Sequence, residues 1–214
     1  MNRAKVAVCL TLLFLVSCQN EWPGRHSSSF ILEYGVGELE VRPQKAAVVV
    51  LMKDWTDRSR YCSGTSDAEW LNLYDSLCIK HRDTSYDKKE RVPVTDYTSC
   101  FYKDFVSIQV ISKQDFDVSH PAGTSLSDIL YYDSLSAYYY IESGYEATFS
   151  HFQIHKNLDE VTSGDMTLLP SRSLFCLSFK SAPISLGAFP LTITLTADDG
   201  MIYEFETEVF FQDL

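Results

Sequence analysis

Two alternating runs near the C-terminus, joined by a glycine turn, constrain the fold of this chain more than any other feature. Residues 191–197 and 201–211 each alternate apolar with polar side chains. This two-residue period is typical of strands with one face on a core. Asp198-Asp199-Gly200 separates the runs, and Asp-Gly favours a tight hairpin turn because glycine readily adopts positive φ. The sequence therefore predicts an antiparallel hairpin here.

Further segments predict strands, so the chain is expected to be mainly β. Residues 46–52 form an apolar run rich in valine, which predicts a strand buried on both faces. Many short strands separated by turn residues are typical of an antiparallel β-sandwich. The strand candidates besides the hairpin are residues 30–34, 39–41, 46–52, 105–111, 138–141, 148–154 and 173–179.

Residues 67–79 predict one accessory helix. Ser66 and Glu69 have the spacing of a capping box, in which each side chain bonds a free backbone N–H at the helix start. Five apolar residues follow at helical spacing: Trp70, Leu73, Tyr74, Leu77 and Cys78. This face should pack on the sandwich, so Trp70 is expected to be buried. The charged run 80–91 is interpreted as a solvated loop rather than a binding patch, because its charges are mixed.

Residues 1–17 predict an export signal. Arg3 and Lys5 precede an apolar run over residues 6–16, which is too short to span a bilayer but suits a signal-peptide core. Leu15-Val16-Ser17-Cys18 resembles a bacterial lipobox. That resemblance implies cleavage after Ser17, a diacylglycerol thioether on Cys18, and fatty acylation, such as palmitate, of the new amine.

Lipidation at Cys18 predicts an outer-membrane lipoprotein, since Gln19 is not the Asp that would favour inner-membrane retention. Whether the domain faces the periplasm or the outside is left open. Residues 18–29 are expected to form a flexible tether to a single domain over 30–214. The chain holds 18 basic against 29 acidic residues, an excess that disfavours nucleic acid as a partner. The expected partners are the membrane, through the lipid, and a protein or glycan.

Four cysteines remain in the predicted domain: Cys62, Cys78, Cys100 and Cys176. Disulfides persist in exported proteins. If the strands at 46–52 and 105–111 are neighbours, the insertion over 62–100 begins and ends at one end of the sheet. This placement predicts a disulfide between Cys62 and Cys100, with Cys78 as the rival partner. Cys176 is interpreted as a core thiol.

Sequence motifs for catalysis, cofactors or metals are not found: the chain lacks GxSxG, HExxH, the P-loop and GxGxxG. On a strand, His151 and His155 would lie about 13 Å apart, too far to share one metal ion. His120 begins the predicted turn His120-Pro-Ala-Gly, and the sequence offers no evident partner to orient it as a general base. We therefore expect no catalytic residues, no metal and no cofactor.

Tyrosines crowd into residues 131–145, and this segment is a candidate binding surface. Exposed aromatic rings can stack on sugars or anchor a protein partner. The candidates are Tyr131, Tyr132, Tyr138 and Tyr140. Packing of most of these rings in the core or at its rim is the favoured alternative.

Three segments carry a family resemblance. Residues 105–117 read FVSIQVISKQDFD, residues 119–130 read SHPAGTSLSDIL, and Ser181-Ala-Pro183 precedes the Asp-Gly hairpin. Together they resemble small Bacteroides-type lipoproteins of unknown function, over roughly residues 45–55 and 100–214. The resemblance implies an immunoglobulin-like sandwich behind a lipid anchor and implies no activity. The helix at 67–79 and the loop at 80–91 depart from the pattern.

The sequence thus predicts a lipid-anchored envelope protein that is a non-enzymatic binding or structural module. The first alternative is a surface accessory that binds glycan or protein through residues 131–145. The second alternative is a hydrolase without a recognisable motif.

Overall fold

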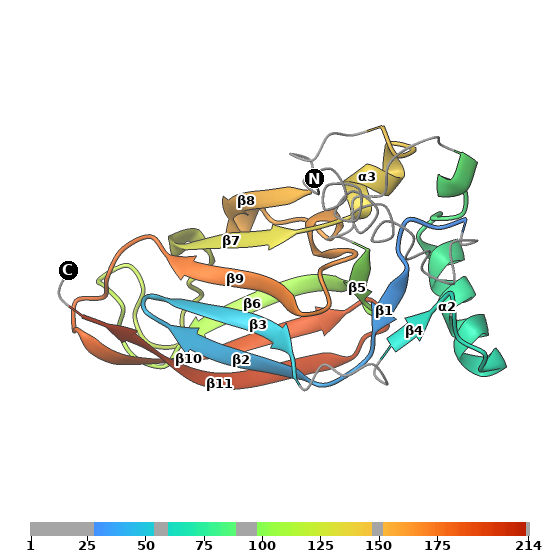
Figure 1. Ribbon diagram of the computed structural model, residues 1–214. Coiled ribbons are helices and arrows are strands. Elements are labelled where there is room, and N and C mark those ends of the chain that lie inside the picture. Colours follow the sequence, from blue (N-terminus) through green and yellow to red (C-terminus); the bar gives the residue numbers. More distant parts are fainter. Residues whose placement is uncertain (1–27, 54–59, 89–97, 147–151, 213–214) are drawn as a thin grey trace, which may run out of the picture.

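The computed structural model describes residues 28–53, 60–88, 98–146 and 152–212 (Figure 1). Its larger sheet is antiparallel and holds, in spatial order, β2 (Leu39–Gln44), β3 (Ala47–Met52), β9 (Ser173–Phe179), β7 (Leu130–Leu135) and β8 (Gln153–Asn157). The second antiparallel sheet holds β11 (Ile202–Phe211), β10 (Gly187–Ala197) and β6 (Phe105–Ser112). A small third sheet holds β4 (Arg60–Cys62), β1 (Glu33–Gly35) and β5 (Ser99–Phe101).

Helical segments are short apart from α2 (Ala68–Lys80). The others are α3 (Tyr138–Glu142) and the 3-10 turns η1 (Tyr86–Lys88), η3 (Ser127–Ile129), η5 (Leu158–Glu160) and η6 (Gly164–Met166). The prediction of a mainly β fold with antiparallel sheets and one accessory helix is confirmed. The immunoglobulin-like type of the sandwich stays a prediction.

The main core lies between the two antiparallel sheets. One face of β10 points into this core, because Leu191, Ile193 and Leu195 are at most 1% exposed. Thr192 and Thr194, which alternate with them, are only half-buried. Strands β3, β7 and β9 supply the facing layer, with Val50, Tyr132 and Leu177 in the same apolar cluster. Each strand therefore gives one set of alternate side chains to the core, as sheet packing requires.

The predicted hairpin is present. β10 and β11 pair in register from Gly187 with Phe211 to Thr196 with Ile202. The turn between them is closed by the N–H of Ala197 on the carbonyl of Met201, at 2.8 Å, and Gly200 has φ +84°. A side chain at Gly200 would be strained by that φ, which explains the Asp-Gly turn.

A second apolar cluster packs α2, α3 and the small sheet at one end of the sandwich. The described chain enters here, because the carbonyl of Ser28 accepts the N–H of Tyr86. The buried carboxylate of Asp83 accepts the N–H groups of Phe30 and Ile31, at 2.7 and 2.8 Å. Tyr145 also donates its hydroxyl to Asp83. These bonds fix the entry of the chain at the α2 end.

Helix α2 is present close to its predicted bounds, but its cap and buried face differ from the prediction. Asp67, not Ser66, is the cap, and its carboxylate accepts the N–H groups of Glu69 and Trp70. Trp70 is half-buried and Leu73 is 40% exposed. The buried positions are Tyr74 and Cys78. The hydroxyl of Tyr74 donates to the carbonyl of Ile31 at 2.7 Å, so the helix is turned to face β1.

Four strand predictions need correction. Only Glu33 and Tyr34 of the predicted strand 30–34 lie in a strand, because β1 begins at Glu33. Residues 138–141 lie in α3, where Tyr140 and Ile141 are buried on one side of a helical turn. The strand over 46–52 is buried on one face only, because Val49 and Leu51 are half-buried. Residues 148–151 of the predicted strand 148–154 lie outside the described residues, and β8 begins at Gln153.

The predicted disulfide is wrong, because Cys62, Cys78, Cys100 and Cys176 are all free thiols. Cys62 pairs with Glu33 on one side of β1, and Cys100 pairs with Tyr34 on the other side. Two strand spacings of about 4.8 Å separate the two cysteines, beyond the roughly 7 Å limit for a disulfide. The prediction assumed that the strands at 46–52 and 105–111 are neighbours. They are not, because β3 and β6 belong to different sheets. Cys176 lies on β9 beside Val49 and Asp133 and is half-buried, so it is not a core thiol.

We predict that the native protein protects two of these thiols from alkylation. Cys78 and Cys100 are each 2% exposed, and burial raises the pKa of both thiols. Little of either thiol is therefore present as the reactive thiolate, and both are shielded from the alkylating reagent. Mass spectrometry after iodoacetamide treatment should show fast labelling at half-buried Cys62, and labelling at Cys78 and Cys100 only after denaturation. A Cys100 disulfide in a non-reduced digest would contradict this structure.

We predict that Ile193→Ala lowers the free energy of unfolding by about 2–5 kcal/mol, because a fully buried side chain leaves a cavity. The neighbouring Thr194→Ala, on the outer face of the same strand, should change it by less than about 0.5 kcal/mol. Urea denaturation of both variants measures the difference. Equal midpoints would show that β10 does not face the core.

Candidate functional site

The candidate site lies at the end of the sandwich opposite α2, and we call it the distal tip. It comprises residues 113–129, which run from the end of β6 through η3, residues 180–188, which include the start of β10, and Phe210 on β11. Figure 1 shows the loops at this end of the two sheets, away from α2 and the small sheet. The two segments meet where the N–H of Ile184 donates to the carbonyl of Phe116 at 2.8 Å. The tip is thus built from chain segments far apart in sequence.

Four phenylalanine rings form the floor of the distal tip. Phe116 comes from the loop, Phe179 from β9, Phe189 from β10 and Phe211 from β11. Phe116 stacks on Phe179 with ring centroids 5.5 Å apart, and it meets Phe189 edge-on at 5.4 Å. Phe179 meets Phe211 edge-on at 5.0 Å. Such pairs add to the energy of burial, so the loop is held to the core at Phe116.

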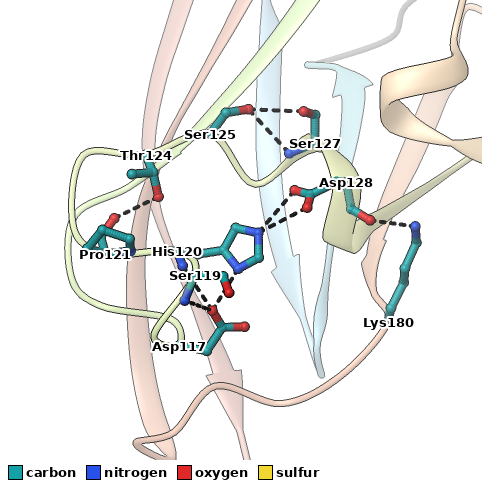
Figure 2. A network of polar contacts seen from close by, with 9 residues as sticks. All are labelled: Asp117, Ser119, His120, Pro121, Thr124, Ser125, Ser127, Asp128 and Lys180. Carbon is teal, nitrogen blue, oxygen red and sulfur yellow. Dashed lines mark hydrogen bonds and ion pairs between the residues drawn. The ribbon is translucent and has the colours of Figure 1, made fainter.

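Above Phe116, the His120 ring joins two carboxylates (Figure 2). Its Nδ1 lies 2.8 Å from Oδ1 of Asp117, and its Nε2 lies 3.1 Å from both carboxylate oxygens of Asp128. Asp117 belongs to the loop, whereas Asp128 belongs to η3. His120 therefore links the distal loop to the segment that leads into β7.

Backbone contacts shape the loop itself. The Asp117 carboxylate accepts the N–H groups of Ser119 and His120, at 2.8 and 2.9 Å. Asp115 accepts the N–H of Ala122 at 2.7 Å. Gly123 has φ +85°, and the turn predicted at residues 120–123 lies one residue later, where the N–H of Thr124 bonds the carbonyl of Pro121 at 3.1 Å. Short polar side chains that bond nearby N–H groups favour such turns.

Lys180 completes the network from the other segment of the tip. Its Nζ donates to the backbone carbonyl of Asp128 at 2.6 Å and lies 5.1 Å from the centre of the Tyr131 ring. Burial lowers the pKa of His120, but the hydrogen bonds to Asp117 and Asp128 outweigh it, so the pKa of His120 is raised. The bond from His120, with a smaller contribution from Lys180, lowers the pKa of Asp128.

The distal tip exposes large apolar side chains. Val118 is 94% exposed, Ile184 69%, Phe210 53% and Leu186 47%. Phe210 pairs across strands with Ala188, which places it beside the segment that carries Ile184 and Leu186. A hollow of about 380 Å³ borders the tip between Lys113, Glu206 and Glu208. An apolar patch with a polar rim is typical of interaction surfaces.

Sequence reasoning missed the partners of His120. It placed His120 at the start of a turn and found nothing to orient it, whereas the structure gives it two carboxylates. The spacing of Asp117 and His120 was a usable signal, because an Asp often bonds the backbone two or three residues onward. The contact with Asp128 depends on how η3 folds back, which local spacing does not reveal.

The His120 group does not have the geometry of a catalytic triad. In a triad one ring nitrogen faces a carboxylate and the other faces the nucleophile. Both nitrogens of His120 face carboxylates. Neither is left to take a proton from a hydroxyl or thiol, so the group is better suited to holding the loop.

The four tyrosine candidates for a binding surface differ in their exposure. Tyr132 is fully buried and Tyr140 is 5% exposed, so neither belongs to a binding surface. Tyr131 and Tyr138 are half-buried. The Tyr131 ring lies 5.0 Å from the His155 ring and has Lys180 at its side. The four residues therefore do not form one exposed aromatic row.

A second histidine, His155, also lacks a catalytic arrangement. Its Nδ1 lies 2.5 Å from Asp133 on the neighbouring strand β7. Cys176 lies on the far side of Asp133 in the same row of the sheet. Burial and the Asp133 charge raise the pKa of the Cys176 thiol, which is the opposite of what a nucleophile needs. His151 lies outside the described residues.

The remaining ionic groups brace the fold. Lys80 of α2 bonds Asp104 and Asp198, each at 2.7 Å, and so ties the helix to the hairpin turn. Asp165 is fully buried and accepts bonds from Lys156 and Thr162. Burial alone would raise the pKa of Asp165, but these bonds lower it. These contacts tie α2 to the hairpin turn and η6 to β8.

Comparison of the chain with protein-family models, with curated proteins and with solved structures found no match. Among the described residues, no three His, Cys, Asp or Glu side chains are grouped so as to hold a metal ion. In that part of the chain, no helix has the length and apolar character needed to cross a membrane. The predicted signal peptide, the lipobox-like segment and Cys18 lie outside the described residues.

Proposed function

We propose that this chain is a lipid-anchored protein of the bacterial outer membrane, with an immunoglobulin-like sandwich that serves as a non-enzymatic binding module. The observation that carries the proposal is the exposure of Val118, Ile184, Leu186 and Phe210 together at the distal tip. Loops on a rigid sandwich are common positions for binding residues. A protein partner fits this patch better than a glycan, because the exposed side chains are mostly aliphatic.

The position of the chain entry supports a tip that points away from the membrane. The described chain enters at Ser28, at the α2 end, and the tip lies at the other end. A lipid on Cys18 would be ten residues from that entry, and an extended tether of that length spans at most about 35 Å. The anchor would thus hold the α2 end near the bilayer and leave the tip accessible.

The tyrosine-based alternative receives less support, since Tyr132 and Tyr140 are buried. The hydrolase alternative has the least support, because the titratable groups described above are paired with each other rather than gathered in a cleft.

We predict that Cys18→Ala abolishes lipid attachment, because only the thiol can form the thioether. Cells fed a labelled fatty acid should lose label on this protein, and the protein should leave the membrane fraction. Cys9→Ala, within the predicted signal core, is the matched control and should keep both properties. Unchanged labelling of the Cys18 variant would contradict the lipoprotein assignment.

We predict that Val118→Ser combined with Ile184→Ser abolishes recovery of a protein partner after cross-linking of intact cells. Both side chains are exposed, so the fold should tolerate the change. Val106→Ser with Ile202→Ser, two exposed apolar residues outside the tip, is the control and should recover the partner normally. Equal recovery from both double variants, or no specific partner from the wild-type protein, would exclude binding at the tip.

A further inference from the structure

The contacts of His120 require a particular protonation state. A carboxylate can only accept hydrogen bonds, and a neutral imidazole has one donor nitrogen and one acceptor nitrogen. Here Nδ1 faces Asp117 and Nε2 faces Asp128, at 2.8 and 3.1 Å. In either neutral tautomer one of these contacts would set a lone pair against a carboxylate. Both contacts are satisfied only when His120 is an imidazolium.

The charges around His120 come from three segments of the tip. Its own loop supplies Asp117 and, further along, Asp115, which is engaged with the N–H of Ala122. η3 supplies Asp128, and the segment after β9 supplies Lys180. Two carboxylates thus face the ring directly, while Lys180 bonds the Asp128 carbonyl rather than the ring. This balance favours the charged imidazolium.

The His120 bridge acts on the exposed part of the loop. The base of the loop is held independently, by Phe116 in the core and by the bonds of Gly123 and Thr124 with Ser112. Val118 lies between Asp117 and His120, in a short segment that is also closed by the N–H of Phe116 on the carbonyl of His120 at 2.9 Å. Loss of the bridge would detach the segment around Val118 from Asp128 of η3, while the base of the loop and the backbone bond between Phe116 and His120 stay in place.

We propose that protonation of His120 latches the distal tip, so that the loop bearing Val118 is held at acidic to neutral pH and released as the pH rises. The latch itself is a property of the free protein. Its consequence, that the partner binds more weakly at alkaline pH, rests on the function proposed above.

The pH window follows from the directions of the pKa shifts. The pKa of His120 is raised in the folded protein, so its stabilising effect is complete below about 6.5, the ordinary histidine value. That effect is lost as the pH rises through the raised pKa. The bond from His120 lowers the pKa of Asp117 and of Asp128, so their contribution is lost only as the pH falls through those lowered values.

Histidine-ring NMR of the purified full chain tests the protonation state. Long-range ¹H–¹⁵N spectra distinguish an imidazolium, with two protonated nitrogens, from a neutral tautomer. We expect His120 to stay doubly protonated to higher pH than it does in Asp128→Asn, where one carboxylate charge is removed. Asp133→Asn, which removes the partner of His155, is the matched control and should leave the His120 titration unchanged.

Hydrogen exchange tests the effect on the loop. After correction for the intrinsic pH dependence of exchange, amides of residues 117–120 should lose protection in a step that follows the His120 titration. The step should be absent in His120→Gln, which would show the low protection at every pH, and retained in His155→Gln. The latch would be overturned if His120 were singly protonated at pH 6, or if the protection of the loop did not change as His120 titrates. These measurements need no partner, so failure of the cross-linking experiment and failure of the latch are separate results.

Discussion

The arrangement of the tip depends on the contacts among four phenylalanine rings at the end of the sandwich. Phe116, Phe179, Phe189 and Phe211 come from four different segments, and their mutual packing closes the core there. Phe116 is 1% exposed although it belongs to a loop. Burial of one loop residue fixes the base of the loop, and the His120 ring then packs edge-on at 6.3 Å from Phe116. The polar bridge is therefore placed by an apolar contact.

The two ends of the sandwich use carboxylates in different ways. At the α2 end, Asp83 is fully buried and bonds to backbone N–H groups. Burial raises the pKa of Asp83, and those bonds oppose the rise. At the distal tip, Asp117 and Asp128 are exposed and bond to a histidine whose charge can change. The buried contact is a permanent brace at the chain entry, whereas the exposed one depends on a proton near physiological pH.

Local sequence signals predicted those elements whose structure is decided by their own residues. The hairpin follows from Asp198-Asp199-Gly200 and the flanking alternation, and α2 follows from its apolar spacing. Elements that depend on distant contacts were not predictable in the same way. Residues 138–141 are three tyrosines and an isoleucine, residue types that are enriched in strands, yet Tyr140 and Ile141 fold into α3 because both pack in the cluster at the α2 end.

The positions of the cysteines and the contact between His120 and Asp128 both depend on how separate segments of the chain pack together. Cys62 and Cys100 were expected to meet where the 62–100 insertion begins and ends at one end of a sheet, but they lie on β4 and β5 with β1 between them. Asp128 reaches His120 only because the N–H of Leu126 bonds the carbonyl of Val110, which brings η3 back over the end of β6. No spacing along the chain encodes either outcome, since both follow from how separate segments dock on the core.

Two of the segments that carry the family resemblance lie next to each other in the structure. His120 and Asp128 both lie in the SHPAGTSLSDIL segment, and Lys180 directly precedes Ser181-Ala-Pro183. The structure brings these two segments together around one charge network, with Lys180 bonded to the Asp128 carbonyl. Residues that carry the pattern are thus ones that shape the distal tip rather than ones that supply a reactive group. Because a binding surface needs fixed loops, this distribution is consistent with the binding module proposed above.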